Sequence, residues 1–442
     1  MKPTDLPTIS QWLVFGLSCL LLLFAPLLRA GNTALALMIM QGLSLGILLI
    51  IAGWRLPHQY ISRPIWWFLV ISIGLVLMYL IPVPETMWRT LPGRTIYVAV
   101  YDWLSEHNKD TIYLALSLIP ANTVYSLLAL LPPLSIFLAI GYLNKRQTLY
   151  LVYVFLGVAA FQAGYGLTQY AAGFSDNASG TYPNRDHFSA LMAMALPLGF
   201  GLAAYRVGNH TKHERDSTEH LERRLNYLLV FISLTLLLLL AGIFSRSRAG
   251  VVLIMLGILL SSLVFSRHIG GKRSTGLMTT ASTIGIGLAI NIGLIPVLNR
   301  FTQANPMEDL RWDFFDTTIA GIQQFFPLGS GPGTFSDIYR ALQPLGQTGN
   351  FVNNAHNDYL ELLFETGLVG AVIILGFFIL YLYGWWQLRQ AAWQQEHFIQ
   401  TGAGIGILLM LLHAVVEFNF HIPANALFFA FLAGLFLCKS RR

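Results

Sequence analysis

The chain has 442 residues, of which 55% are hydrophobic and only 11% are charged, and its mean hydropathy is +0.60. Soluble domains carry about 25% charged residues, so this composition excludes an ordinary soluble protein and indicates an integral membrane protein. The net charge of +6 does not indicate a nucleic-acid partner, because most Lys and Arg residues fall in short loops between apolar runs. The two cysteines, Cys19 and Cys438, predict neither a disulfide framework nor a metal site, and we expect no cofactor.

About twelve apolar runs are long enough to cross a bilayer, which takes about 20 helical residues. The first run lacks a small-x-small cleavage site and a second run follows at once, so we interpret it as a retained helix. Lys and Arg are concentrated in the loops that would be cytoplasmic if the N-terminus is inside, which predicts an N-in, C-in topology. The predicted spans are residues 11–28, 33–53, 65–82, 123–142, 148–171, 187–205, 225–243, 249–266, 276–295, 366–387, 399–417 and 424–438.

These spans predict an all-α membrane protein with one large polar loop. We divide the chain into nine spans in residues 1–295, a partly helical loop in residues 296–365, and the C-terminal spans in residues 366–442. The loop would face the periplasm or the cell exterior, where connecting segments carry function on a rigid scaffold. A second outer segment, residues 83–122, contains an apolar stretch from Ile96 to Leu104 that we expect along the membrane surface.

Two outer connections within the first 295 residues contain candidate site residues. In the first, Asp186 is expected to cap the following span, and Arg185 and His187 are secondary candidates for which a structural role is favoured. In the second, Arg246 and Arg248 oppose the positive-inside trend, and Ser245 or Ser247 can cap the helix that follows. Helix amides beside guanidinium groups form an anion site, with phosphate as the expected anion. The alternative is that these arginines extend to lipid head groups.

The large loop begins with a predicted amphipathic helix from Met307 to Phe326. Arg311 belongs to its apolar face, and a half-buried cation requires an anionic partner, either a ligand or a structural carboxylate. The glycine-rich stretch at 327–335 has the wrong spacing for a dinucleotide fingerprint. We interpret it as a tight turn that returns the loop to the site.

The loop ends in the stretch from Asn353 to Gly367, which contains the principal catalytic candidate. Asn353 or Asn354 is expected to cap a helix, with His356 in its first turn and Asn357 as a secondary site residue. The helix dipole there favours the neutral imidazole that a general base requires. The alternative is a histidine that only caps or packs at the membrane surface.

Near the C-terminus, His413, Glu417 and His421 recur at intervals of four and would share one helix face. We expect the helix to end near Glu417, so a hydrogen bond between His413 and Glu417 is favoured over a metal site.

Taken together, these motifs resemble the O-antigen ligase and polysaccharide polymerase family of bacterial envelopes. One departure is the stretch at 180–188, which has Arg185-Asp186 where the family suggests more asparagine. The resemblance spans residues 181–429, whereas the first 170 residues match only as generic spans. It rests on SRSRAG at 245–250, Arg311 followed by PLGSGPGTF at 327–335, AHNDYLELLFETGLVG at 355–370 and EFNFHIPANALFF at 417–429.

The resemblance implies a GT-C-like, inverting glycosyltransferase in the bacterial inner membrane, with its active site facing the periplasm. Its donor would be a glycan on undecaprenyl diphosphate. The acceptor would be lipid A–core, another carrier-linked glycan or a protein, and the sequence leaves this choice open. Arg246 or Arg248 would hold the diphosphate together with Arg311, and His356 would activate the acceptor hydroxyl. Glu417 is a further secondary candidate.

The competing function class is a multi-pass polysaccharide or lipid transporter, or a flippase. Such a protein has ionisable residues near the bilayer midplane, broken helices and pseudo-symmetric halves. Here the unusual charges fall near one face, and the large loop interrupts any symmetry between the halves. A structural scaffold would not need the arginine and histidine set, so an enzyme is favoured.

Overall fold

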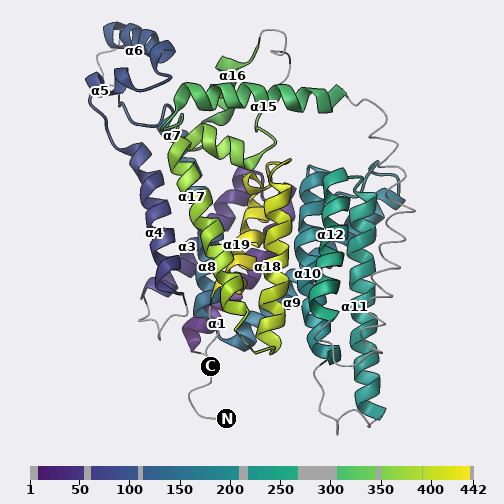
Figure 1. The fold of residues 1–442 in the computed structure, drawn as a ribbon. Helices are drawn as coiled ribbons and strands as arrows, with labels where there is room; N and C mark the ends of the chain where they lie inside the picture. Colours follow the sequence, from purple (N-terminus) through teal and green to yellow (C-terminus); the bar gives the residue numbers. More distant parts are fainter. Residues whose placement is uncertain are drawn as a thin grey trace.

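The protein is an all-helical membrane protein in the part of the chain that the computed structural model describes (Figure 1). Eight helices of this part are long and apolar enough to cross a membrane. The described residues are 8–53, 61–107, 113–208, 218–266, 306–344, 349, 351–390 and 392–438.

The helices follow one another with short connections. They are α1 (Ile9–Phe24), α2 (Leu27–Ala30), α3 (Ala34–Gly53), α4 (Arg63–Leu77), α5 (Glu85–Thr90), α6 (Thr95–His107), α7 (Pro120–Ala129), α8 (Leu131–Tyr142), α9 (Lys145–Ala171), α10 (Arg185–Gly208), α11 (Thr218–Phe244), α12 (Arg248–Phe265), α15 (Pro306–Phe325), α16 (Phe335–Leu342), α17 (Asp358–Leu388), α18 (Gln395–His413) and α19 (Pro423–Leu437), with 3-10 turns η2 (Met78–Leu80) and η7 (Asn419–His421).

The predicted spans correspond closely to these helices. The runs at 11–28, 399–417 and 424–438 form the shorter or less apolar helices α1, α18 and α19, and the run at 276–295 lies outside the described residues. The others match the eight candidate spans, in which η2 extends α4 and α7 joins α8.

Helix α10 is the centre of the bundle, and 94% of its span is buried inside the protein. It packs against α9, α11, α12 and α18. The contact with α18 depends on Gly402 and Gly406, since a Cβ at Gly402 would lie 2.6 Å from the Pro197 carbonyl oxygen and one at Gly406 would lie 2.9 Å from that of Met194. Small residues four apart let two helix backbones approach closely without the side-chain packing that water would drive.

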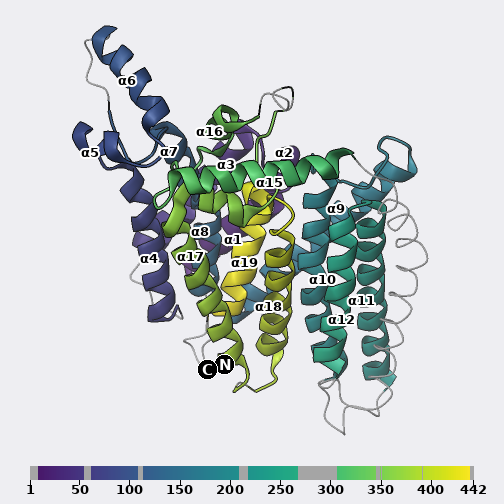
Figure 2. The ribbon, with the colours of Figure 1, turned by 45° about the horizontal axis from the view of Figure 1, so that its top comes forward.

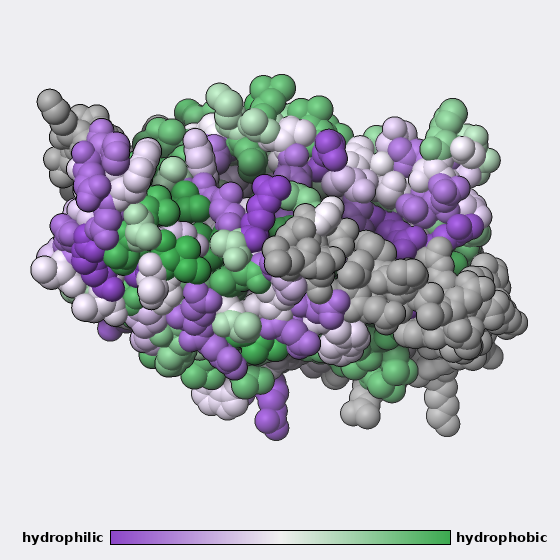
Figure 3. Space-filling model, turned by 90° about the horizontal axis from the view of Figure 1, so that it is seen from above, coloured by the Kyte–Doolittle hydropathy of each residue, from purple (hydrophilic) through white to green (hydrophobic). Residues whose placement is uncertain are grey.

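The two ends of the bundle differ. Helix α15 lies across one end, with α16 above it, and Figure 2 shows the same arrangement from a tilted view; we call this the α15 end. At the opposite end, Lys145 at the start of α9 lies 3.0 Å from Glu396 at the start of α18. Helix α1 also begins there, because Ser10 contacts Tyr142 at the end of α8. Seen from the α15 end, hydrophilic and hydrophobic residues are intermixed over the surface (Figure 3).

The predicted amphipathic helix in the large loop is confirmed as α15. Phe314, Thr318, Gly321 and Phe325 are buried, whereas Asp313 and Asp316 are exposed. The buried face covers a small second core that also includes α16 and the start of α17; its members are Phe314, Phe325, Phe335, Ile338, Tyr339, Val352, Ala355 and Phe364.

Helix α17 is divided by a kink at Gly367, whose φ is +53°. A Cβ at this position would lie 2.2 Å from the Pro327 carbonyl oxygen, which instead accepts a hydrogen bond from the Leu368 amide. Glycine is therefore required here. The kink coincides with the predicted boundary near residue 366, so the part of α17 before it belongs to the α15 end.

The second outer segment, residues 83–122, contains α5, α6 and the start of α7. Helix α6 projects beyond α15, away from the bundle (Figure 1). No residue of α6 is buried, and the apolar side chains of Ile96, Val100 and Trp103 are exposed.

Candidate functional site

The stretch before α17 differs from its predicted form. The helix begins at Asp358, and its N-cap is Asn357, whose side chain accepts hydrogen bonds from the amides of Tyr359 and Leu360. The prediction that Asn353 or Asn354 caps the helix is therefore wrong, and so is the position of His356 in its first turn. Asn357 wins because only its side chain reaches two free amides of the first turn.

His356 lies two residues before the helix, in the left-handed backbone conformation with φ of +52°. Its ring stacks on Phe314 of α15 at 6.4 Å between centroids and meets the edge of Phe418 at 4.8 Å. Its Nδ1 atom lies 3.3 Å from Oε2 of Glu417, and the histidine side chain is 23% exposed whereas Glu417 is 1% exposed. No described residue bonds Nε2, so a buried carboxylate holds one ring nitrogen and the other remains available.

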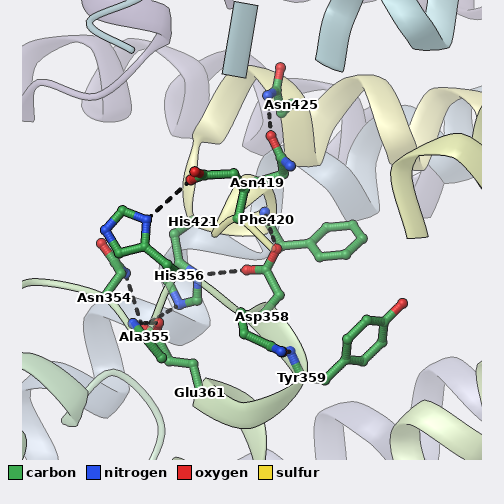
Figure 4. A network of polar contacts seen from close by, with 12 residues as sticks. Asn354, Ala355, His356, Asp358, Tyr359, Glu361, Asn419, Phe420, His421 and Asn425 are labelled. Carbon is green, nitrogen blue, oxygen red and sulfur yellow. Dashed lines mark hydrogen bonds and ion pairs between the residues drawn. The ribbon is translucent and has the colours of Figure 1, made fainter. Parts of the chain in front are cut away.

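Beside this pair, the first turns of α17 present buried carboxylates to a second histidine (Figure 4). His421 of η7 lies with Nδ1 3.0 Å from Asp358 and with Nε2 3.2 Å from Glu361. Burial alone would lower the pKa of His421, but the neighbouring Glu361 and Asp358 carboxylates raise it to about 10. His421 is therefore a cation at neutral pH, with both ring nitrogens donating.

The same carboxylates hold the backbone around His356. Oε2 of Glu361 accepts a 2.7 Å hydrogen bond from the Ala355 amide, and Oε1 accepts one of 2.9 Å from the Asn354 side chain. Asp358 accepts from the Phe420 amide, which ties α17 to η7. Both carboxylates are almost fully buried.

The glycine-rich stretch after α15 returns the loop to the site, as predicted. A carboxylate of the protein occupies its amides: Glu365 Oε1 accepts a 2.9 Å hydrogen bond from the Phe335 amide, and Gly331 donates to the Glu365 carbonyl oxygen at 2.7 Å. The turn therefore anchors α17, and these bonds already use amides that could have faced a ligand.

The two arginines after α11 have different local structures. Ser247 is the N-cap of α12 and accepts a hydrogen bond from the Gly250 amide, as predicted. Arg246 precedes the cap with a φ of +57°, is exposed, and its guanidinium lies 5.7 Å from the centre of the Tyr170 ring. Arg248 is the first residue of α12 and is partly buried. Arg311 lies in α15, but its side chain is outside the described part of the structure.

The outer connection before α10 also differs from its predicted form. Asn184, not Asp186, provides the cap, since its side chain accepts a 2.8 Å hydrogen bond from the Asp186 amide. Arg185 opens the helix and is partly buried. His187 is fully buried, with Nδ1 3.1 Å from the Asn419 side chain and its ring against Phe418. This is the structural environment that was favoured for it.

Contacts between elements bring most of these segments together at the α15 end. A Cβ at Gly250 would lie 2.1 Å from Oγ of Ser189, so the first turn of α12 touches that of α10. His187, one turn before, and His356 both contact Phe418. The α12 N-terminus, the α10 N-terminus, η7 and the His356 segment therefore form one continuous neighbourhood beneath α15.

The predicted grouping of His413, Glu417 and His421 on one helix face is wrong, because α18 ends at His413. Glu417 bonds His356, and His421 bonds α17. The described residues contain no group of three His, Cys, Asp or Glu side chains that could hold a metal ion.

Sequence reasoning missed Asp358, Glu361 and Asn419 as parts of the site. One signal was available: Asp358, Glu361 and Glu365 are spaced three and four apart, so they share one helix face directly after His356. That face would otherwise have been expected to be solvated, whereas here all three carboxylates are buried.

A family model described as O-antigen ligase matches residues 233–375, a segment that contains α12, α15, α16, His356 and the first half of α17. A search of curated proteins finds no match for the chain.

Proposed function

The matched segment places the chain in an O-antigen ligase/polymerase family, and we propose that it is a membrane glycosyltransferase with its site at the α15 end. The donor is a glycan on undecaprenyl diphosphate, and the acceptor is a hydroxyl of lipid A–core or of a growing polysaccharide. The α15 end faces the periplasm of a bacterial inner membrane.

The observation that carries the proposal is the pairing of His356 with the buried carboxylate of Glu417. A carboxylate on Nδ1 fixes the tautomer that carries its proton there, so Nε2 is the basic nitrogen. The other two histidines of the neighbourhood are less suited, because His421 donates from both nitrogens and His187 is fully buried. His356 is the general base of the proposed reaction.

In the proposed reaction, Nε2 of His356 takes the proton of the acceptor hydroxyl as its oxygen attacks the anomeric carbon. The bond from that carbon to the diphosphate oxygen breaks, and the diphosphate-carrying lipid leaves with the electron pair. An in-line displacement inverts the anomeric configuration. Glu417 stabilises the imidazolium that forms, as the acidic member of a catalytic triad does.

Arginines supply the charge that the leaving group needs. We assign this role to Arg311 and to one of Arg246 and Arg248, because guanidinium groups bind diphosphate oxygens bidentately and stabilise the charge that develops there. The two residues before and at the start of α12 differ in exposure and backbone conformation, so only one of them is expected to reach the diphosphate.

The test uses the full-length protein in detergent with a carrier-linked glycan donor and each acceptor class in turn. His356→Gln keeps a polar side chain but cannot take the proton, so it should lower kcat by about 10²- to 10⁴-fold with little change in donor KM. Arg311→Lys keeps the charge but loses the bidentate fork and should raise donor KM. Arg146→Ala, at the opposite end, is the matched arginine control.

A His356→Gln protein with near-wild-type transfer would overturn the assignment of the base. Transfer to lipid A–core identifies a ligase, whereas elongation of carrier-linked glycan identifies a polymerase. Movement of the intact lipid-linked glycan across vesicles, without transfer, would instead support the transporter alternative.

A further inference from the structure

His356 has a backbone conformation that side chains other than glycine rarely adopt, with φ of +52°. A residue in this region costs on the order of 1–3 kcal/mol and persists only where its surroundings fix it. Neither the Asn357 cap nor the ring contacts restrain the peptide unit before His356. The groups that hold this peptide unit must therefore lie elsewhere.

Those groups are on the first turns of α17. Glu361 accepts hydrogen bonds from the Ala355 amide at 2.7 Å and from the Asn354 side chain at 2.9 Å, so one buried carboxylate holds both residues that precede His356. The Asp358 amide donates to the Ala414 carbonyl oxygen, which fixes the chain after His356 onto the end of α18. His356 is thus held on both sides.

Glu361 in turn depends on His421. The imidazolium bridges Glu361 and Asp358 at 3.2 and 3.0 Å, and so it balances two buried carboxylates that would otherwise repel each other. His421 lies four residues after Glu417, in the same short segment between α18 and α19. One ionic bridge therefore joins the strand of chain that holds His356 to the strand that holds Glu417.

We propose that Glu361 and His421 are positioning residues that set His356 against Glu417 and aim its Nε2 atom at the acceptor. They do not touch the reacting groups. This inference rests on the proposed function, because His356 needs to be aimed only if it is the base. Misplacing a catalytic group by about 1 Å can cost on the order of 100-fold in rate, so the bridge has a measurable consequence.

The chain offers a matched control. Glu365 is the next carboxylate on the same face of α17 and is equally buried, but it accepts the Phe335 amide of the glycine-rich turn and not an amide beside His356. Glu361→Gln and Glu365→Gln make the same chemical change one turn apart. Only the first removes charge from the bridge to His421.

Two measurements on the full-length protein in detergent test the inference. In Glu361→Gln, amide hydrogen exchange should accelerate at least about tenfold in a peptide covering 353–357 and stay unchanged in one covering 328–336; Glu365→Gln should give the reverse. Glu361→Gln should also lower kcat about 10- to 100-fold at unchanged donor KM, whereas Glu365→Gln retains most of its kcat. His421→Arg, which keeps two donors and a positive charge, should restore most of the kcat that His421→Leu loses.

The outcomes separate the inference from the proposed function. Normal kcat in Glu361→Gln, despite faster exchange at 353–357, would overturn the positioning role. Lost kcat with unchanged exchange would also overturn it, because Glu361 would then act on the substrate directly. If instead His356→Gln transfers glycan normally while the exchange pattern is as predicted, the proposed base is wrong and the structural bridge stands.

Discussion

At the scale of single residues, three buried glutamates at the α15 end have three distinct partners. Glu417 holds a ring nitrogen of His356, Glu361 holds the peptide before it, and Glu365 holds the glycine-rich turn. Buried carboxylates are costly unless they are hydrogen-bonded or paired, so each marks a contact that the fold requires. The cation that balances this acidic group among the described side chains is His421.

The first prediction concerns the pH dependence of stability that His421 creates. Its pKa is raised to about 10 in the folded protein, against about 6.5 in an unfolded chain. Below pH 6.5 both states hold the proton and the stabilising contribution is complete. As the pH rises toward 10, only the unfolded state has lost the proton, so the contribution declines and is gone above that pH.

The apparent Tm of the protein in detergent should therefore fall between pH 6.5 and pH 10. His421→Arg stays charged throughout this window and should show a shallower decline. Equal slopes for the two proteins would mean that the bridge from His421 to Asp358 and Glu361 does not contribute to stability.

At the scale of elements, α15 is held in place by its narrow buried face. Gly321 lies where a Cβ would be 2.1 Å from the ring of Phe364 on α17, so the two helices approach as closely as the missing side chain allows. The same docking brings Phe314, two turns earlier, onto the ring of His356. The position of α15 and the position of the proposed base are therefore coupled.

The second prediction is that Gly321→Ala loosens α15. Inserting one methyl group into a packed contact costs about 1–3 kcal/mol, which should speed hydrogen exchange of α15 and lower transfer activity together. Gly157→Ala, in α9, is the matched control because a Cβ there meets nothing within 4 Å. Exchange in α15 that is the same in both variants would show that Phe364 moves aside without cost.

At the scale of the whole molecule, the two ends of the bundle have different roles. The α15 end gathers the buried carboxylates, the histidines and the N-termini of α10 and α12, whereas the opposite end carries the first turns of α1, α9 and α18. Charged and polar groups within membrane proteins mark functional sites because they are costly to place there. The proposed orientation directs the α15 end to the periplasm.

The third prediction tests this orientation by cysteine labelling in intact spheroplasts. Glu106→Cys in α6 and Asp313→Cys in α15 should react with an impermeant thiol reagent, whereas Arg146→Cys and Gln390→Cys should not. All four positions are exposed in the structure, and the unsubstituted chain controls for Cys19 and Cys438. The reversed pattern would contradict the N-in, C-in topology and the periplasmic site.

The sequence by itself determined the membrane class, the positions of most helices and the amphipathic helix α15. These features follow from local composition and periodicity, because a bilayer demands about 20 apolar residues per span and a half-buried helix repeats every 3.6 residues. The cap at Ser247 followed from the same kind of local rule.

The tertiary structure alone decided how the site is assembled. Asn353, Asn354 and Asn357 are chemically alike, and only the docking of α17 against Ala414 and Glu361 selects Asn357 as the cap and leaves His356 before the helix. Glu417 looked like a partner for His413 at helical spacing, but α18 ends first and the carboxylate bonds His356 instead. Pairings between residues distant in sequence depend on how the helices pack, which no local pattern encodes.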